Sequence, residues 1–227
     1  SDVCSSDLGL AGPKMDYYNI GRVQWAGVNG MVEYNDQDKL TAVMQAGWSQ
    51  QNYRRIDYFD QVGNPESSKN DSPGGYVKGG ANFNFDAQNN AFFNAGYISR
   101  QPLFDAVFPG FANNINPDLQ NEKITSFELG YGFLSSNFKL NLNAYSTVWG
   151  NRVLSRVSGS GDNAVRFVYE GVEQTHQGIE AELTWYPTSQ LKIRGMASLG
   201  DHKYTKNFNG QGFRDRKSTR LNSSHVR

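Results

Sequence analysis

The sequence predicts an all-β protein, an antiparallel up-and-down meander of about eight strands. Apolar and polar residues alternate along most of the chain, which is the pattern of strands whose two faces meet different surroundings. No stretch combines a 3.6-residue period with helix caps. Aromatic residues make up 13% of the 227 residues and glycines number 24, a mixture that favours strands joined by turns.

The composition excludes two other classes of protein. The formal net charge is zero and the basic residues form no amphipathic patch, so we expect no nucleic-acid partner. The longest apolar runs are a few residues long, which is too short for a transmembrane helix.

Short and long connections alternate between the expected strands. The strands are residues 22–34, 39–60, 76–85, 91–100, 122–134, 138–155, 165–186 and 191–204. The short turns are 35–38, 86–90, 135–137 and 187–190, and the long connections are 61–75, 101–121 and 156–164. Outer-membrane barrels place short turns in the periplasm and long loops outside, so this rhythm predicts part of a larger transmembrane outer-membrane β-barrel. A soluble β-sandwich also alternates, but one strand over 39–60 would span roughly 70 Å, too long for a small sandwich.

The first four strands are predicted from the turns between them and from the alternation of apolar and polar residues. Asp36 and Asp38 in NDQD suit turn chemistry better than a calcium site. In the third strand, Val77, Ala81, Phe83 and Phe85 alternate with Lys78, Gly80, Asn82 and Asn84.

The fifth and sixth strands form a hairpin around residues 135–137. Phe127, Leu129, Tyr131 and Phe133 alternate with polar or small residues, and so do Phe138, Leu140, Leu142 and Ala144. Pairing Phe133 with Phe138 keeps both apolar faces together and places Glu128 roughly opposite Asn143.

The seventh and eighth strands repeat this pattern. Pairing Trp185 with Leu191 places Glu182 opposite Arg194 on the polar face, where a cross-strand charge pair would contribute about 0.2–1 kcal/mol.

In a barrel, the apolar face meets lipid and the polar face lines the lumen. The residues predicted to face lipid are Phe127, Leu129, Tyr131, Phe133, Phe138, Leu140, Leu142, Ile179, Leu183, Trp185, Leu191 and Ile193. Those predicted to face the lumen are Glu128, Lys139, Asn141, Glu180, Glu182, Lys192 and Arg194. Aromatic residues beside the short turns predict a girdle at the periplasmic membrane edge: Tyr34, Phe85, Phe92, Phe93, Phe133, Phe138 and Tyr186.

The two ends of the chain resemble translated sequencing-library adapter. SDVCSSDL (1–8) and DRKSTRLNSSH, which opens the segment 215–227, can be back-translated so that the first is the reverse complement of part of the second. We therefore expect 1–8 and 215–227 to be artefacts and 9–214 to be native sequence. Cys4 then drops out, and we expect no disulfide or thiolate metal site in the native part.

Two segments carry motifs of a known family. In NPDLQNEKITSFELGYGF the matching residues are Asn116, Pro117, Leu119, Glu122, Ser126, Glu128, Gly130 and Tyr131, with Asn121 where the family usually has proline. In THQGIEAELTWYPTSQLKIRGMASLGDHKY they are Gly178, Glu180, Glu182 and Pro187. Together the segments resemble the barrel of TonB-dependent outer-membrane receptors, so 9–214 is expected to be about eight strands of a barrel of about 22.

The resemblance implies TonB-energised uptake of a scarce ligand, such as an iron chelate, cobalamin or a glycan, in the outer membrane of a Gram-negative bacterium. The partners it implies are the lipid bilayer, lipopolysaccharide, an extracellular ligand, and TonB acting through a plug domain that is missing from this sequence. The alternative is a barrel without TonB coupling, serving as a porin, adhesin or structural surface protein. A plug domain with a TonB box upstream would decide between them.

No residues suggest an enzyme, a cofactor or a metal site. His176 is interpreted as a lumen-lining residue rather than a metal ligand, and GSGD at 159–162 lacks the helix that a phosphate loop requires. Ligand-contact candidates lie on the long loops and the outer end of the second strand, because binding residues concentrate on loops held by rigid scaffolds. They are Tyr53, Arg54, Arg55, Phe104, Asp105, Phe108 and Phe111, and ordinary loop packing is the alternative for each.

Overall fold

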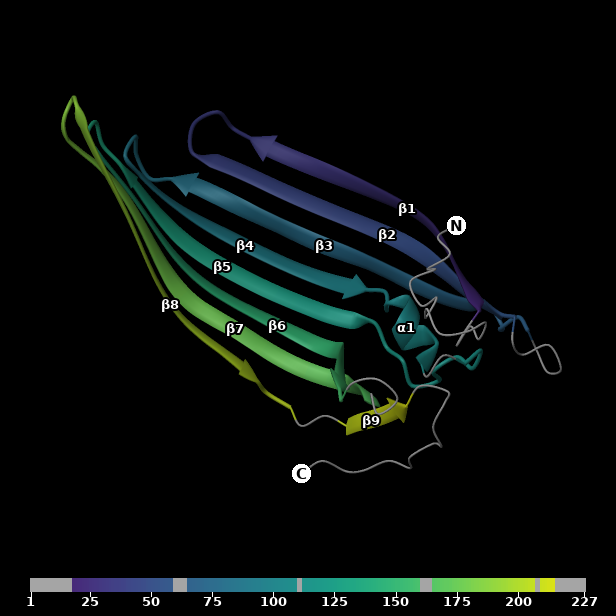
Figure 1. The fold of residues 1–227 in the computed structure, drawn as a ribbon. Helices are drawn as coiled ribbons and strands as arrows, with labels where there is room; N and C mark the ends of the chain where they lie inside the picture. Colours follow the sequence, from purple (N-terminus) through teal and green to yellow (C-terminus); the bar gives the residue numbers. More distant parts are fainter. Residues whose placement is uncertain (1–17, 59–64, 110–111, 160–164, 207–208, 215–227) are drawn as a thin grey trace.

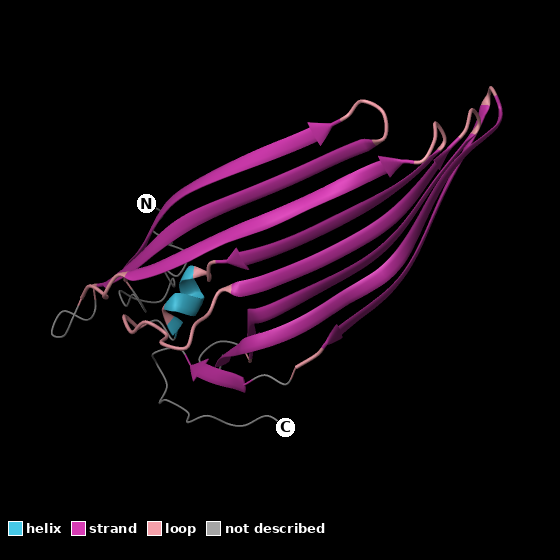
Figure 2. Ribbon diagram, turned by 180° about the vertical axis from the view of Figure 1, so that it is seen from behind, coloured by secondary structure: helices cyan, strands magenta, loops and turns pink. Residues whose placement is uncertain are grey.

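The structure, a computed structural model, describes residues 18–58, 65–109, 112–159, 165–206 and 209–214. These residues form one antiparallel sheet that curves like a gutter (Figures 1 and 2). The strand order follows the sequence, and β1 and β8 lie at the two ends of the order. The predicted antiparallel meander of about eight strands is confirmed.

The meander consists of long strands and contains no large helix in the described part of the chain. The strands are β1 (Asn19–Asn35), β2 (Leu40–Asp57), β3 (Asn70–Asn84), β4 (Asn89–Arg100), β5 (Glu122–Leu134), β6 (Phe138–Ser158), β7 (Val165–Thr188) and β8 (Leu191–Tyr204). A four-residue helix, α1 (Phe104–Val107), lies between β4 and β5. Among the described residues, no helix has the length and apolar character needed to span a membrane.

A further short strand, β9 (Asn209–Arg214), was not predicted. It pairs with the first residues of β7, whereas β8 pairs with β7 from Gln174 onward. Between them, the backbone N–H of Thr205 donates to the carbonyl of Glu173 at 3.0 Å. β9 therefore continues the course of β8 along the same neighbour and adds no new position to the meander.

The hairpin of β2 and β3 reaches further than predicted. β3 begins at Asn70, inside the segment 61–75 that the sequence predicts as a long loop. The backbone N–H of Asp57 donates to the carbonyl of Pro65 at 2.7 Å, and that of Ser67 donates to Arg55 at 2.8 Å. The polar end of β2 thus keeps its backbone hydrogen bonds beyond the regular ladder, as buried backbone groups require.

The register joins the polar residues into one continuous face. Gly80 lies opposite Asn94, and Asn94 lies opposite Glu128. On β2, the same face carries Tyr53, against which α1 packs. Because α1 lies inside the curve of the sheet (Figures 1 and 2), this polar face lines the hollow.

All twelve side chains predicted to face lipid share the outer face of the sheet, and all seven predicted to face the lumen share the hollow face. Many on the outer face are exposed, with Leu129 at 61% and Phe127 at 53%. That the outer face meets lipid and that the hollow is a lumen stay predictions.

The predicted register of the hairpin between β5 and β6 is wrong by two residues. Phe133 lies opposite Leu140 rather than Phe138, and Glu128 lies opposite Tyr145 rather than Asn143. The turn is closed by the backbone N–H of Ser135, which donates to the carbonyl of Phe138 at 2.7 Å. A shift of two residues leaves every side chain on its predicted face, because the side-chain period of a strand is two.

The register of β7 and β8 is corrected in the same way. Trp185 lies opposite Ile193 rather than Leu191. Arg194 consequently faces Thr184, so the predicted pairing of Arg194 with Glu182 is wrong. An irregularity between Trp185 and Thr188 accounts for the shift, since a bulge gives one strand residues without a direct partner.

Two aromatic residues depart from the predicted girdle. Phe92 lies on the hollow face, where a Cβ on Gly130 would collide with its ring. Tyr186 also turns toward the polar side, with the Nζ atom of Lys192 5.1 Å from the centre of its ring. Both residues sit beside a turn, but alternation decides their face.

Aspartates close two of the short turns, a role that the sequence predicts for Asp36 but not for Asp86. Asp36 accepts hydrogen bonds from the backbone N–H groups of Asp38, Lys39 and Leu40 at 2.9–3.0 Å. Asp86 accepts backbone N–H groups from Gln88 and Asn89 at 2.8 and 2.9 Å. These bonds favour the ionised carboxylate and lower the pKa of both aspartates.

Candidate functional site

Residues of the long connection 101–121 fold back into the hollow at the end of the sheet away from the short turns. They bury a small apolar cluster, which we call the packed end: Tyr53, Val107 and Phe108, with Phe104, Ile115 and Leu119 packed against them. The phenol of Tyr53 donates to the carbonyl of Pro102 at 2.6 Å. One strand residue therefore anchors the loop by both burial and a hydrogen bond.

Two opposite charges lie beneath the loops at the outer end of β2. Arg55 and Asp57 are 3% and 1% exposed, and their charged groups are 4.0 Å apart. The backbone N–H of Arg55 donates to the hydroxyl of Ser67 at 2.9 Å, and its guanidinium reaches the carbonyl of Ala112 at 3.5 Å. Buried charges persist only when paired and hydrogen-bonded. Through its bonds to Ser67 and Ala112, Arg55 ties both loops to β2.

The structure brings three of the seven ligand-contact candidates together and separates the others. Tyr53, Phe104 and Phe108 meet in the packed end, where Tyr53 is 2% and Phe108 3% exposed. In this arrangement, contact between a ligand and Tyr53 or Phe108 requires the loop to move. Asp105 is exposed on α1, and Phe111 lies outside the described residues.

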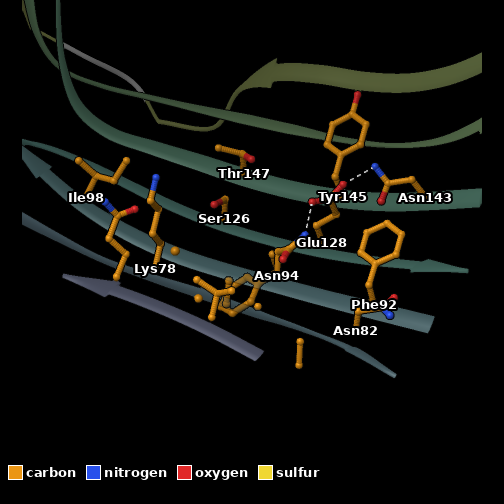
Figure 3. Close-up of a pocket in the computed structure, with 18 of the residues that line it drawn as sticks. Lys78, Asn82, Phe92, Asn94, Ile98, Ser126, Glu128, Asn143, Tyr145 and Thr147 are labelled. Carbon is orange, nitrogen blue, oxygen red and sulfur yellow. Dashed lines mark hydrogen bonds between the residues drawn. The ribbon is translucent and has the colours of Figure 1, made fainter. Parts of the chain in front are cut away.

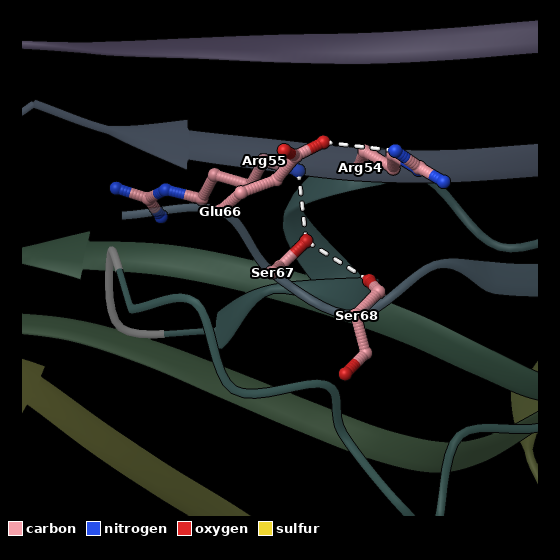
Figure 4. Close-up of polar contacts among 5 residues, drawn as sticks. All are labelled: Arg54, Arg55, Glu66, Ser67 and Ser68. Atoms are coloured by element: carbon pink, nitrogen blue, oxygen red, sulfur yellow. Dashed lines mark hydrogen bonds and ion pairs between the residues drawn. The ribbon is translucent and has the colours of Figure 1, made fainter. Parts of the chain in front are cut away.

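The two neighbouring arginines of β2 have different surroundings. The guanidinium of Arg54 pairs with Glu66 at 2.9 Å on the surface, whereas Arg55 is buried. Figure 4 shows their side chains pointing apart, with Ser67 bonded to the backbone of Arg55. Side chains of adjacent strand residues point to opposite faces. The sequence prediction placed Arg54 and Arg55 in one contact region and did not take this alternation into account.

An asparagine of the family motif ties the long loop to β7. The amide of Asn116 donates to the carboxylate of Glu170 at 2.6 Å. Glu170 lies about 60 Å along its strand from Thr188, at about 3.3 Å per residue, and so beyond the expected membrane-spanning part. Burial raises the pKa of Glu170 and the charge of Asp118 adds to this, while the bond from Asn116 opposes it.

The middle of the hollow is lined by amides and a carboxylate, and we call this surface the amide hollow. Its centre is Glu128, whose two oxygens accept the amides of Asn94 at 2.9 Å and Asn143 at 2.7 Å (Figure 3). The cavity has a volume of about 760 Å³. Its labelled lining in Figure 3 is Lys78, Asn82, Phe92, Asn94, Ile98, Ser126, Glu128, Asn143, Tyr145 and Thr147.

Aromatic rings cover glycines on this face. The ring of Phe92 lies over Gly130, and Tyr145 lies over Gly178 with its hydroxyl 2.8 Å from where a Cβ would stand. A larger residue at either glycine would displace the ring. Such cross-strand pairs help to set strand register, so these glycines position the aromatic lining of the hollow.

Two arginines lie against a tryptophan on the hollow face, at the end of the sheet away from the short turns. The guanidinium carbons of Arg152 and Arg100 lie 4.5 and 6.0 Å from the ring centre of Trp149. Arg100 also pairs with Glu122 at 2.5 Å. Trp149 therefore lies on the polar side, where strict alternation from Phe138 places it. The family-motif residue Glu122 pairs with Arg100 and neutralises one of the two cations beside Trp149.

Sequence reasoning missed part of this lining. Asn94 and Phe92 belong to a strand whose faces the sequence analysis did not assign, although Asn90, Asn94 and Gly96 at alternate positions carry the signal. The arrangement can hydrogen-bond a polar ligand and stack on it. Within the described residues, no group of three or more His, Cys, Asp or Glu side chains is placed to hold a metal ion.

Of two solved structures compared with the chain, the first supports a barrel fold. The copper transporter OprC aligns with a TM-score of 0.61 at 14% identity, over 81% of this chain and 30% of that protein. The siderophore receptor PirA from Pseudomonas aeruginosa aligns with a TM-score of 0.41 at 10% identity, over 91% of this chain and 56% of that protein. The chain thus spans less than two thirds of either protein.

Comparison with families and with curated proteins gives a second finding. No curated protein sequence matches the chain. Residues 4–225 match the family described as "TonB dependent receptor-like, beta-barrel", a family of receptors and transporters. The matched range includes most of both terminal segments, whose assignment to adapter sequence stays a prediction. The chain belongs to the β-barrel family of TonB-dependent receptors.

Proposed function

We propose that this chain forms part of the barrel wall of an outer-membrane receptor that takes up a scarce ligand with energy from TonB. One observation carries the proposal. Large apolar side chains are exposed on the outer face, while hydrogen-bonded amides and charges occupy the hollow face. Water-soluble proteins bury apolar side chains instead, so this distribution suits a wall between lipid and a wet lumen.

In this proposal the two ends of the hollow have different tasks. The loops over the packed end lie outside the cell, where ligand arrives, and the short turns lie in the periplasm. The amide hollow lines the passage beyond the loops. TonB acts through a plug domain elsewhere in the receptor, and lipid and lipopolysaccharide of a Gram-negative outer membrane surround the outer face. The ligand class is an iron chelate, cobalamin or a glycan, and the wall contributes no catalytic step.

The orientation of the wall is tested by paired cysteine variants of the complete receptor. Leu129→Cys and Glu128→Cys are adjacent in β5 but on opposite faces. In outer-membrane vesicles, we expect a water-soluble maleimide to label the Glu128→Cys variant through the lumen and to leave the Leu129→Cys variant unlabelled. A lipid-soluble maleimide should show the reverse preference. Equal labelling of both variants by the water-soluble reagent would contradict the proposed wall.

Coupling to TonB is tested by uptake in cells. Cells that carry the complete receptor are offered ferric catecholate, ferric hydroxamate, cyanocobalamin and an oligosaccharide, each radiolabelled. We expect uptake of one class, abolished when TonB is deleted. Uptake that persists without TonB would indicate a porin, and binding to host surfaces without uptake would indicate an adhesin.

A further inference from the structure

Two histidines face each other across the last strand pair of the meander. His176 in β7 lies directly opposite His202 in β8, and their ring centres are 4.8 Å apart with an angle of 49° between the rings. They are the only histidines in the described part of the chain, since the third, His225, lies outside it. Both lie on the hollow face, because His176 alternates with Gly178, opposite Tyr145.

Two glycines beside the histidines let an imidazole and a phenol approach each other closely. Gly178 and Gly200 lie opposite each other, two residues from His176 and His202 along the same face. The Nε2 atom of His202 is 2.8 Å, and the hydroxyl of Tyr145 3.3 Å, from where a Cβ on Gly200 would stand. An imidazole nitrogen and a phenol oxygen therefore border the same notch over Gly200.

Two carboxylates on or beside the same strands pair with lysines. Asp201 lies on the other face of β8 and pairs with Lys203 at 2.8 Å. Glu173 pairs with Lys206 at 3.0 Å and accepts the hydroxyl of Thr205 at 2.8 Å. Both carboxylates are therefore engaged by lysines, and Asp201 also interacts electrostatically with the neighbouring His202.

We propose that His176 and His202 form a binding site for a first-row transition-metal ion, with Cu²⁺ bound most tightly. Neutral imidazole nitrogens are ligands for copper, nickel and zinc, and affinity at such sites is highest for Cu²⁺. Two imidazoles directly opposite on paired strands can occupy neighbouring coordination positions, and water or the Tyr145 phenol can complete the shell. Magnesium and calcium prefer oxygen ligands and do not suit the pair.

The site lies in the outer part of the hollow. His176 is about 40 Å along β7 from the turn at Thr188, at about 3.3 Å per residue. A metal ion bound there would be reached from the outer opening. The inference concerns binding alone and holds whether or not the proposed TonB-coupled uptake is correct.

The test is Cu²⁺ titration of the complete receptor in detergent, followed by calorimetry and electron paramagnetic resonance. We expect a resonance split by two nitrogen donors. His176→Gln and His202→Gln should each weaken this site on the order of 100-fold, because each removes one arm of a chelate. Asp201→Asn, next to His202 but on the other face, is the matched control: it removes a neighbouring charge but no metal ligand, and should change the affinity far less than either histidine variant. Ni²⁺ and Zn²⁺ should bind more weakly and Mg²⁺ not at all.

A second measurement needs no variant. Diethyl pyrocarbonate modifies accessible imidazoles, and mass spectrometry locates the modified residues. In the unsubstituted receptor, Cu²⁺ should protect His176 and His202 together. Loss of Cu²⁺ affinity in Asp201→Asn equal to that in the histidine variants would overturn the proposal, as would unchanged modification of both histidines in the presence of Cu²⁺.

Discussion

The packed end and the amide hollow lie on the same face of one sheet but are stabilised differently. At the packed end, Val107 and Phe108 of a loop that is far away in sequence pack against Tyr53 of β2. In the amide hollow, Glu128 joins three strands by accepting Asn94 and Asn143. The packed end resembles the core of a soluble protein, because apolar side chains are buried there. In the amide hollow, hydrogen bonds link the strands although no second layer of structure covers them.

The difference shows which part of the sheet depends on its surroundings for stability. Only six hydrophobic residues of the described part are buried; three of them, Tyr53, Val107 and Phe108, belong to the packed end, and Ala106 is next to them in α1. Elsewhere most large apolar side chains of β5–β8 stand exposed on the outer face, whereas Trp25 and Met31 of β1 are exposed on the hollow face. Burial is the main favourable term in folding, so the middle of the sheet requires an apolar environment that the packed end does not.

Removing the anchor of the packed end should have the largest effect. Tyr53→Ala deletes a buried aromatic ring and should weaken docking of the loop by about 3–5 kcal/mol, the range for large aromatic truncations. Tyr53→Phe is the control, because it keeps the ring and loses only the contacts of the hydroxyl with Pro102 and Gln51, at about 0.5–1.5 kcal/mol. Limited proteolysis of the complete receptor measures this: cleavage within 101–121 should rise strongly in the alanine variant. A loop equally protected in all three proteins would mean that the cluster does not hold it.

A lysine placed on each face of one strand sharpens the comparison between outer face and hollow. In the proposed barrel wall, Leu142→Lys puts a charge on the lipid-facing side, where it should cost about 2–4 kcal/mol. Asn141→Lys, the neighbouring position, points into the hollow opposite Glu182 and should change stability by no more than about 0.5 kcal/mol. Urea unfolding in lipid vesicles gives both values. Similar costs at the two positions would remove the distinction between the faces.

The centre of the amide hollow should respond less. Glu128→Ala leaves the amides of Asn94 and Asn143 to water and should cost about 1–2 kcal/mol, because the two bonds are to a charged acceptor on a hydrated face. Glu128→Gln keeps one acceptor oxygen and should cost about half as much. The same urea unfolding measures both variants, and a stabilising effect of Glu128→Ala would show that the carboxylate is not the link between the strands.

Alternation made most of the sheet predictable from sequence. β5 and β8 have the predicted bounds, and every residue assigned to a face of β5–β8 lies with its group, because a strand has a side-chain period of two. The predicted registers at Phe133 and Trp185 were wrong. The number of residues in a turn or bulge is set by local backbone hydrogen bonds, such as that from Ser135 to Phe138, and alternation does not reveal it.

The candidate site was less predictable than the sheet. The fold of residues 101–121 depends on Val107 and Phe108 finding Tyr53 about fifty residues earlier, and no local pattern encodes such a contact. The opposition of His176 and His202 depends on the register of β7 and β8, which the sequence placed two residues away. Side-chain faces are local properties, whereas these two contacts are long-range.

The smallest expected effect concerns acid and the turn at Asp36, far from both regions. The pKa of Asp36 is lowered from 3.8, mainly by the backbone N–H of Leu40 and then that of Asp38. A carboxyl whose pKa is lower when folded stabilises the turn above 3.8 and loses this contribution as the pH falls through the lowered pKa. Exchange of the amide hydrogens of Asp38 and Leu40, corrected for intrinsic rates, should therefore accelerate in acid. Asp36→Asn keeps an acceptor oxygen but cannot ionise, so its exchange should not depend on pH in this way, and an equal acid response in that variant would exclude Asp36 as the cause.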